Sequence, residues 1–294
     1  MYLVRSHGYD KRKFPTSVKH RRMTQKPTAL VVGATGALGK ALTRDLLQTD
    51  LFRRVITIGR RPVEFPEGSG VPTENLISRI SMPIARLSVV WSKSIDAQLL
   101  VVCHRIFLPQ NAAENSYVFG TLGIARKAAG SPENFKRIDQ GYIVKTAKIA
   151  AEENPGQGEN ALSPVHYIYC SSIGANARSH FLYLKSKGET ENALAESCNL
   201  SRVTTVRPTG LDVEEERPRG TYWYETLVFD YINRPLNWLG FKMSAPVAVL
   251  ARGMRRAALG EIPEKMRVIK KTKGNGTVFN IIEYKEFIEL GLQP

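Results

Sequence analysis

A tyrosine and a lysine stand four positions apart in a segment of helical character, as Tyr183 and Lys187. On a helix this spacing places the phenol and the ammonium on one face. Lowering the pKa of a tyrosine from about 10 to about 7 requires about 4 kcal/mol. One cation about 4 Å away supplies that order of energy at an effective dielectric constant of about 20. Lys187 is therefore expected to lower the pKa of Tyr183, and the pair could transfer a proton.

The spacing Y-x-x-x-K is common by chance, so the functional interpretation depends on where the pair lies in the chain. The apolar segment 165–169 comes before it and ends at Cys170-Ser171-Ser172, as a buried strand would. A serine hydroxyl at the end of that strand could donate a hydrogen bond to a substrate carbonyl. Ser171 is our first candidate for this task, and the sequence does not choose between it and Ser172.

Three glycines with regular spacing follow the apolar run 29–32, and a helical pattern comes after them. In a strand-to-helix turn, Gly33 would permit the tight turn, Gly36 the approach of backbone to a pyrophosphate, and Gly39 close packing of helix on sheet. The N-terminus of the helix then offers free N–H groups to an anion. An ordinary glycine-rich turn is the alternative, but the strand before and the helix after favour phosphate binding.

The end of the next strand, 55–58, indicates which dinucleotide would bind. An NAD site usually has an acidic residue there to accept a hydrogen bond from the ribose 2′-hydroxyl. Here the strand ends in Gly59-Arg60-Arg61, with no acid before Glu64. A guanidinium binds a 2′-phosphate through charge-assisted hydrogen bonds. The sequence therefore favours NADP(H), while two solvated arginines in a loop are the alternative.

Strands alternate with helices along most of the chain. Further strands are expected at 117–119, 165–169 and 202–206, with helices around residues 138–149 and 183–197. We place Ile138, Tyr142, Thr146 and Ile149 on the buried stripe of the first of these helices. This alternation predicts an α/β fold with a Rossmann-type, doubly wound parallel sheet over residues 29–212.

Two parts of the chain are harder to assign. Residues 63–116 carry several prolines, with strands expected only at 87–91 and 99–103, so the segment is interpreted as a possible insertion. Residues 213–294 show helical segments at 222–232, 246–259 and 281–290. They predict a small helical C-terminal cap for substrate.

Composition excludes several classes of protein. The 294 residues contain no apolar run long enough for a membrane helix. The three cysteines form no CxxC pair, and His104, His166 and His180 have no metal-ligand spacing, so we expect neither disulfides nor a metal site. The basic run Arg267, Lys270, Lys271 and Lys273 lacks interleaved aromatics. It is interpreted as a solvated loop, not a nucleic-acid surface.

Residues 1–28 have eight basic side chains and a single acid, Asp10, within a net charge of +15 for the whole chain. This composition is typical of a mitochondrial presequence. A solvated tail is the alternative, and translation from Met23 would remove most of the segment. We expect a mitochondrial location, with the cytoplasm as the alternative. Any membrane association is expected to be peripheral, with the outer mitochondrial membrane as its candidate site.

Together these motifs resemble the atypical branch of the short-chain dehydrogenase/reductase superfamily, in particular the family of the mammalian HIV Tat-interacting protein 2 (CC3) and its fungal mitochondrial relatives. The resemblance covers most of residues 29–260. The matching stretches are VVGATGALGKAL (31–42), VITIGRR (55–61), ENFKRIDQGYIVKTAKIAAE (133–152), YCSSIGANARSHFLYLKSKGETE (169–191) and VRPTGL (206–211).

The resemblance implies a role for each matching position. The cofactor loop of the family falls on Gly33, Thr35, Gly36, Ala37, Leu38 and Gly39, its 2′-phosphate arginines on Arg60 and Arg61, and its Leu-Gly pair on Leu122 and Gly123. Tyr183 would transfer the proton, and Lys187 would be its partner and contact the cofactor ribose. Arg207 would line the nicotinamide end of the pocket, with pairing to a local acid as the alternative.

Two functions from different classes follow. The first is an NADPH-dependent reductase of a small carbonyl substrate, which the Tyr183/Lys187 pair and the serine favour. The second is a protein that senses NADPH and acts through a protein partner. Ile124 and Ala125 stand where the family has two threonines, and this departure favours the second function. Nothing in the sequence names the substrate.

Overall fold

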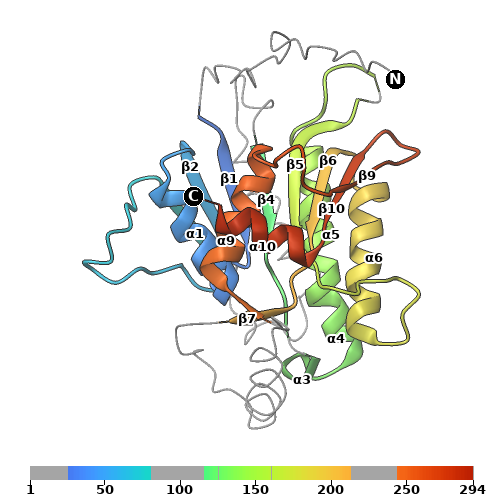
Figure 1. The fold of residues 1–294 in the computed structure, drawn as a ribbon, viewed down its shortest axis with the longest axis horizontal. Helices are drawn as coiled ribbons and strands as arrows, with labels where there is room; N and C mark the ends of the chain where they lie inside the picture. Colours follow the sequence, from blue (N-terminus) through green and yellow to red (C-terminus); the bar gives the residue numbers. More distant parts are fainter. Residues whose placement is uncertain (1–25, 81–115, 125, 160, 213–243, 294) are drawn as a thin grey trace, which may run out of the picture.

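The computed structural model describes residues 26–80, 116–124, 126–159, 161–212 and 244–293 (Figure 1). Within these ranges a sheet of eight strands runs through the middle, in the order β3-β2-β1-β4-β5-β6-β10-β9. The strands are β1 Thr28–Val32, β2 Arg54–Gly59, β3 Leu76–Ile80, β4 Ser116–Gly120, β5 Ser163–Cys170, β6 Leu200–Val206, β9 Ile269–Thr272 and β10 Val278–Ile282. All pairings are parallel except that of β9 with β10. The predicted Rossmann-type fold is confirmed.

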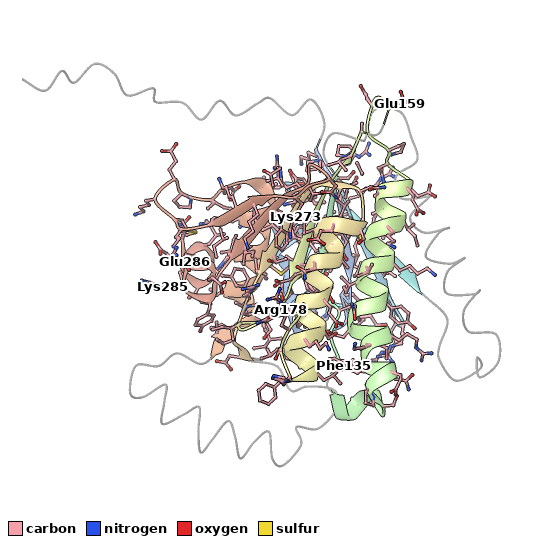
Figure 2. All side chains as sticks on the ribbon, turned by 90° about the vertical axis from the view of Figure 1, so that its right-hand side faces the viewer. Phe135, Glu159, Arg178, Lys273, Lys285 and Glu286 are labelled. Atoms are coloured by element: carbon pink, nitrogen blue, oxygen red, sulfur yellow. The ribbon has the colours of Figure 1, made fainter. Side chains whose placement is uncertain are left out.

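Helices cover both faces of this sheet. On one face lie α1 (Ala37–Gln48), α9 (Val247–Leu259) and α10 (Tyr284–Leu292), and α9 packs against both of the others. On the other face lie α4 (Pro132–Lys136), a π-helical turn (Arg137–Gly141), α5 (Tyr142–Glu152) and α6 (Leu182–Ser197). Figure 2 shows α5 and α6 side by side against the sheet. The short helix α3 (Arg126–Ala129) precedes α4.

Neighbouring residues of the central strands point to opposite faces, and each face has its own core. Leu30 and Val118 are fully buried on the side of α5 and α6. Val31 and Phe119 are fully buried on the side of α1 and α9. Strands covered on both faces must be apolar throughout, which is why their sequences read as continuous hydrophobic runs.

The C-terminal part of the chain differs from the expected helical cap. The segment 281–290 begins in strand β10, where Phe279, Ile281 and Ile282 are buried beside β6, and its helix starts only at Tyr284. The basic segment 267–273, expected as a loop, contains strand β9 at the sheet edge. Residues 247–292 therefore complete the Rossmann body. The expected helix over 222–232 lies outside the described residues.

Two short strands flank the part of the presumed cap that the structure leaves undescribed. They are β7 (Gly210–Asp212) and β8 (Ser244–Pro246), and they pair in parallel as a separate small sheet.

Residues 63–116 also differ in part from expectation. The sequence analysis missed β3, which adds a parallel strand beside β2. The expected strands over 87–91 and 99–103 lie outside the described residues, as do residues 1–25 of the basic extension.

The close seat of α6 is expected to depend on Gly188. A Cβ atom on this residue would lie 2.2 Å from the backbone nitrogen of Ala177 and 2.4 Å from the carbonyl carbon of Asn176. Alanine normally stabilises a helix relative to glycine by about 1 kcal/mol. Here we expect Gly188→Ala to lower the free energy of unfolding by about 1–3 kcal/mol because the helix must move off its neighbour.

Denaturant unfolding measures this effect. Gly274→Ala is the matched control, since nothing lies within 4 Å of its Cβ position, and we expect a change within about 0.5 kcal/mol. A Gly188→Ala protein as stable as the wild type would show that α6 does not need this close approach.

A second prediction concerns acid stability. His166 of β5 is buried, with ring nitrogens 3.1 Å from the carbonyl oxygen of Ala258 and 2.8 Å from the Thr204 hydroxyl. Burial lowers the pKa of His166 to about 3 from an ordinary 6.5. Between these pH values only the unfolded chain binds the extra proton. Stability contributed by this residue is therefore present above pH 6.5 and falls on acidification by about 1.4 kcal/mol per pH unit.

We expect His166→Gln to flatten the dependence of unfolding free energy on pH between 6.5 and the acid limit of reversible folding. His180 is exposed, so His180→Gln should keep the wild-type slope. Equal slopes for all three proteins would contradict a buried neutral imidazole at position 166.

Candidate functional site

The turn between β1 and α1 is built on close backbone approaches. Gly33 has φ +87°, a conformation that favours glycine, and its Cβ position would lie 2.7 Å from the Cα of Leu122. A Cβ on Gly39 would lie 2.3 Å from the carbonyl oxygen of Gly33. Side chains at these two positions would push apart the turn, the helix and the end of β4.

The N-terminus of α1 carries no charge that would oppose an anion. Gly36 is its N-cap residue, no side chain caps it, and its first turn holds no acid. Ala37 begins the helix, and Leu38 is buried against the core. Exposed N–H groups with a positive helix dipole bind phosphate well. The geometry expected for the glycine motif is present.

The two arginines predicted to select the cofactor lie beside this turn. β2 pairs with β1 and ends at Gly59, whose Cβ position would be 3.8 Å from the methyl group of Thr35. Arg60 and Arg61 follow immediately, and both are exposed. Arg60 is also close enough to Tyr142 to lower the pKa of that phenol, although burial raises it overall. Two positive charges thus lie next to the glycine turn.

Leu122 and Gly123 connect the glycine turn to a second group of residues. They follow β4, where the backbone nitrogen of Thr121 donates a hydrogen bond to Val32 of β1. The Leu122 backbone lies against Gly33, and the Cβ position of Gly123 is 3.7 Å from a carboxylate oxygen of Asp139. The cofactor loop and the Asp139 carboxylate are therefore neighbours.

The second group centres on the Lys187 ammonium. Its Nζ lies 3.0 Å from Oδ1 of Asp139, and 5.2 and 5.6 Å from the ring centroids of Tyr169 and Tyr183. The side chains of Lys187 and Asp139 are 4% and 0% exposed. Tyr183 is 44% exposed, so a molecule outside the helix can reach it. Phe135 of α4 stands 6.3 Å from the Tyr183 ring, near the end of α6 (Figure 2).

The electrostatics of the tyrosine differ from expectation. Burial raises the pKa of Tyr183 above its ordinary value, and Asp139 adds to the rise, while Lys187 and a hydrogen bond with Ser172 oppose it. Burial alone would lower the pKa of Lys187, but the nearby Tyr169 and Asp139 raise it. Lys187 lowers the pKa of Tyr183, as the sequence predicts, but the effect of burial is larger, so the pKa of the phenol stays above its ordinary value.

The structure separates the two candidate serines. The Ser172 hydroxyl lies close enough to the Tyr183 phenol to lower its pKa, and it donates to the carbonyl oxygen of Ile173 at 3.3 Å. Ser171, our first candidate, is 3% exposed, and its hydroxyl has no hydrogen-bond partner among the described residues. Its backbone nitrogen instead donates to Val206 of β6. Ser172 is therefore the serine that stands beside the phenol.

Arg207 adopts the alternative arrangement that the sequence allowed. Its Nε and Nη2 donate to the two carboxylate oxygens of Glu191 at 3.0 and 2.6 Å, and its Nη1 donates to Glu283 at 2.9 Å. The carboxylate of Glu191 is 5% exposed. The guanidinium thus joins the ends of β6 and β10 to α6. A contact with cofactor stays a prediction.

Sequence reasoning missed Asp139. The expected helical stripe is confirmed at Thr146 and Ile149, which are buried. Its first half, at Ile138 and Tyr142, is out of phase by one residue, because the buried positions there are Asp139 and Ile143. The π-helical turn Arg137–Gly141 contains the aspartate, and turns of this type are frequent at functional sites. An acid four residues before a buried isoleucine was the available signal.

Within the described part of the chain, no group of three or more His, Cys, Asp or Glu side chains could hold a metal ion. Over the same residues, no helix combines the length and the apolar character that a membrane crossing requires.

Comparison with known proteins adds a family context, although no protein-family model matches the chain. The mitochondrial protein FMP52-1 of Scheffersomyces stipitis is 27% identical over 90% of this chain and 98% of its own. HTATIP2 of Rattus norvegicus is 28% identical over 78% of this chain and 80% of its own.

Solved structures show the same fold at lower identity. A double mutant of a Serratia marcescens short-chain dehydrogenase/reductase is 11% identical, covers 90% of this chain and 98% of its own, and has a TM-score of 0.52. The Bordetella bronchiseptica enzyme WbmF, solved in complex with NAD+, is 15% identical over 79% of this chain and 69% of its own, at a TM-score of 0.50. The FMP52 and HTATIP2 proteins are thus homologues of this chain, and its fold is the one found in these short-chain dehydrogenase/reductase structures.

Proposed function

We propose that the protein is an NADP(H)-dependent reductase that acts on a small carbonyl compound. The observation that carries this proposal is the placement of a partly exposed phenol, Tyr183, beside Ser172 and Lys187, at the same end of the sheet as the glycine turn. A cofactor-binding protein without chemistry has no need of a proton donor at this position.

The residues around the glycine turn fit a nicotinamide dinucleotide. A side chain at Gly33 or Gly39 would collide with backbone, and the uncapped N-terminus of α1 has no acid to repel phosphate. WbmF, which has the same fold, is in complex with NAD+, a dinucleotide of this class. Arg60 and Arg61 supply the charge that would distinguish a 2′-phosphate from a 2′-hydroxyl.

The side chains at the far end of this site divide the work of a carbonyl reduction. The bound nicotinamide would supply the hydride. The Ser172 hydroxyl would hold the carbonyl oxygen by a hydrogen bond, and Tyr183 would give that oxygen its proton. Lys187 would stabilise the phenolate that remains until water returns the proton.

An NADPH-sensing protein that acts on a protein partner is the second candidate. The departure at Ile124 and Ala125 supports it, because substrate contacts in the family fall on this segment. The turnover assay described below separates the two functions.

For location we propose mitochondria. FMP52 relatives in several yeasts are named as mitochondrial, and the basic, acid-poor residues 1–28 have the composition of a presequence. Association with the surface of a membrane is part of the same proposal.

The arginine pair is expected to set the preference for NADPH over NADH. Replacing both with alanine removes charge-assisted hydrogen bonds to the 2′-phosphate, each worth about 1.5–3 kcal/mol. We expect Arg60→Ala with Arg61→Ala to weaken NADPH binding by about 10²- to 10⁴-fold and to leave NADH binding nearly unchanged, as measured by calorimetry.

Arg53→Ala with Arg54→Ala is the matched control, because this exposed pair lies at the opposite end of β2. It changes the net charge equally and should keep the preference. Equal affinity of the wild type for both dinucleotides would contradict the assignment of Arg60 and Arg61.

Loss of the phenol hydroxyl is expected to abolish proton donation. Across a panel of aldehydes, ketones and quinones, we expect Tyr183→Phe to slow NADPH oxidation by about 10²- to 10⁴-fold. The binding of NADPH should be nearly unchanged, because the glycine turn is untouched. Tyr284→Phe, on α10, is the control and should keep wild-type turnover.

The outcomes separate the functions. No turnover by the wild type with any substrate, despite tight binding of NADPH, would favour the sensing protein. Turnover that survives Tyr183→Phe would leave a reductase but remove Tyr183 as its proton donor.

A further inference from the structure

The ion pair between Asp139 and Lys187 is buried. Its two charged atoms are 3.0 Å apart, and Oδ2 of Asp139 accepts a second hydrogen bond from the Ser186 hydroxyl at 3.4 Å. Removing two charges from water is costly, and a buried ion pair often contributes little to stability relative to apolar side chains of similar volume. This makes a purely stabilising role a weak explanation for the pair.

The position of Asp139 depends on an irregular stretch of helix. The chain passes from α4 through the π-helical turn into α5, and this turn directs the carboxylate toward α6. Irregular helical turns persist where the surrounding structure compensates for them, and they are frequent at functional sites. The compensation here is the contact with Lys187.

We propose that Asp139 is a positioning residue, which fixes the Lys187 ammonium and offsets its charge so that the Tyr183 phenol stays protonated and ready to donate. This inference rests on the proposed function, since it assigns the proton donor of the same site. A lysine beside a tyrosine is usually expected to lower the pKa of the phenol. A lysine whose charge is offset by a carboxylate stabilises the phenolate less, so it lowers that pKa less.

The charged and titratable groups around the phenol are consistent with this role. Strand β5 contributes Tyr169 and Cys170, the π-helical turn contributes Asp139, and α6 contributes Lys187 itself. Farther along α6, Glu189 is paired with Lys136 of α4, and Glu191 is paired with Arg207. Among the groups that act on Tyr183, Lys187 is the cation and Asp139 is its direct counterion.

Without Asp139, the ammonium would remain in a buried place with no carboxylate. Two phenols among the described residues can then become its counterion by losing a proton, Tyr169 and Tyr183, whose ring centroids lie 5.2 and 5.6 Å from Nζ. Tyr169 is fully buried, whereas Tyr183 is 44% exposed and can pass its proton to water. Tyr183 would therefore lose the proton needed for reduction before substrate binds. Asp139 would thus favour the reducing direction over a wider range of pH.

Titration of the Tyr183 phenolate by its absorbance tests this without any substrate. The signal of Tyr183 is obtained as the difference between each protein and the same protein carrying Tyr183→Phe, both free of cofactor. We expect Asp139→Asn to raise the ratio of phenolate to phenol by about ten-fold at a given alkaline pH. In the same variant, the pH profile of carbonyl reduction should fall away at lower pH than in the wild type.

Two variants control for other effects. Like Asp139→Asn, Glu189→Gln removes one negative charge, in this case on α6. The Glu189 side chain is 27% exposed and pairs with Lys136, so Tyr183 should titrate as in the wild type. Asp139→Asn combined with Lys187→Met removes both charges, and the phenolate should then form at no lower pH than in the wild type.

The wild type alone keeps the test decisive if Asp139→Asn fails to fold. The proposal requires Tyr183 of the cofactor-free wild type to titrate above the ordinary value of tyrosine, and a titration near neutral pH would overturn it. An unchanged titration in folded Asp139→Asn would also overturn it. Because neither result depends on turnover, failure here is distinguishable from failure of the proposed reductase.

Discussion

A single buried cation organises the functional end of this protein. The Lys187 ammonium lies out of water and is met by the carboxylate of Asp139 and by the rings of Tyr169 and Tyr183. Those partners come from a π-helical turn, from a central strand and from the helix of the lysine itself. A buried charge without such partners would cost several kcal/mol. The relative placement of these three elements is therefore tied to one ion pair.

The same region depends on backbone surfaces that meet without side chains between them. Gly33 and Gly39 allow the β1–α1 turn to lie against Leu122, and Gly188 allows α6 to lie against the segment with Asn176 and Ala177. The first contact brings the glycine turn to the end of β4. The second holds the helix that carries Tyr183 and Lys187. Together they place the glycine turn and the Tyr183 phenol at one edge of the sheet.

The sequence predicts those parts of the site that lie close together in the chain. The glycine turn, the arginines after β2 and the Tyr183/Lys187 pair each belong to a single element and its neighbour, so local patterns in the sequence are enough to predict where they lie in the fold. The contact of Asp139 with Lys187 was not predicted, because the two residues are 48 positions apart and because a π-helical turn shifts the helical phase by one residue. The choice of Ser172 over Ser171 likewise required the path of the chain after β5.

The C-terminal boundary shows a different limit. Phe279, Ile281 and Ile282 are apolar and β-branched or aromatic, which suits a strand, but they merge without a break into the amphipathic pattern of α10. Only pairing with β6 decides where the strand ends. The sequence also left open whether Arg207 contacts a cofactor or pairs with an acid, since one of its partners, Glu283, is 76 residues away.

The most direct test of the account is a crystal structure of the protein with NADP+. The account predicts the pyrophosphate on the N-terminus of α1, the 2′-phosphate beside Arg60 and Arg61, and the nicotinamide ring next to the Tyr183 hydroxyl, with the Asp139–Lys187 pair intact. A dinucleotide bound elsewhere, or one whose nicotinamide points away from Tyr183, would contradict it.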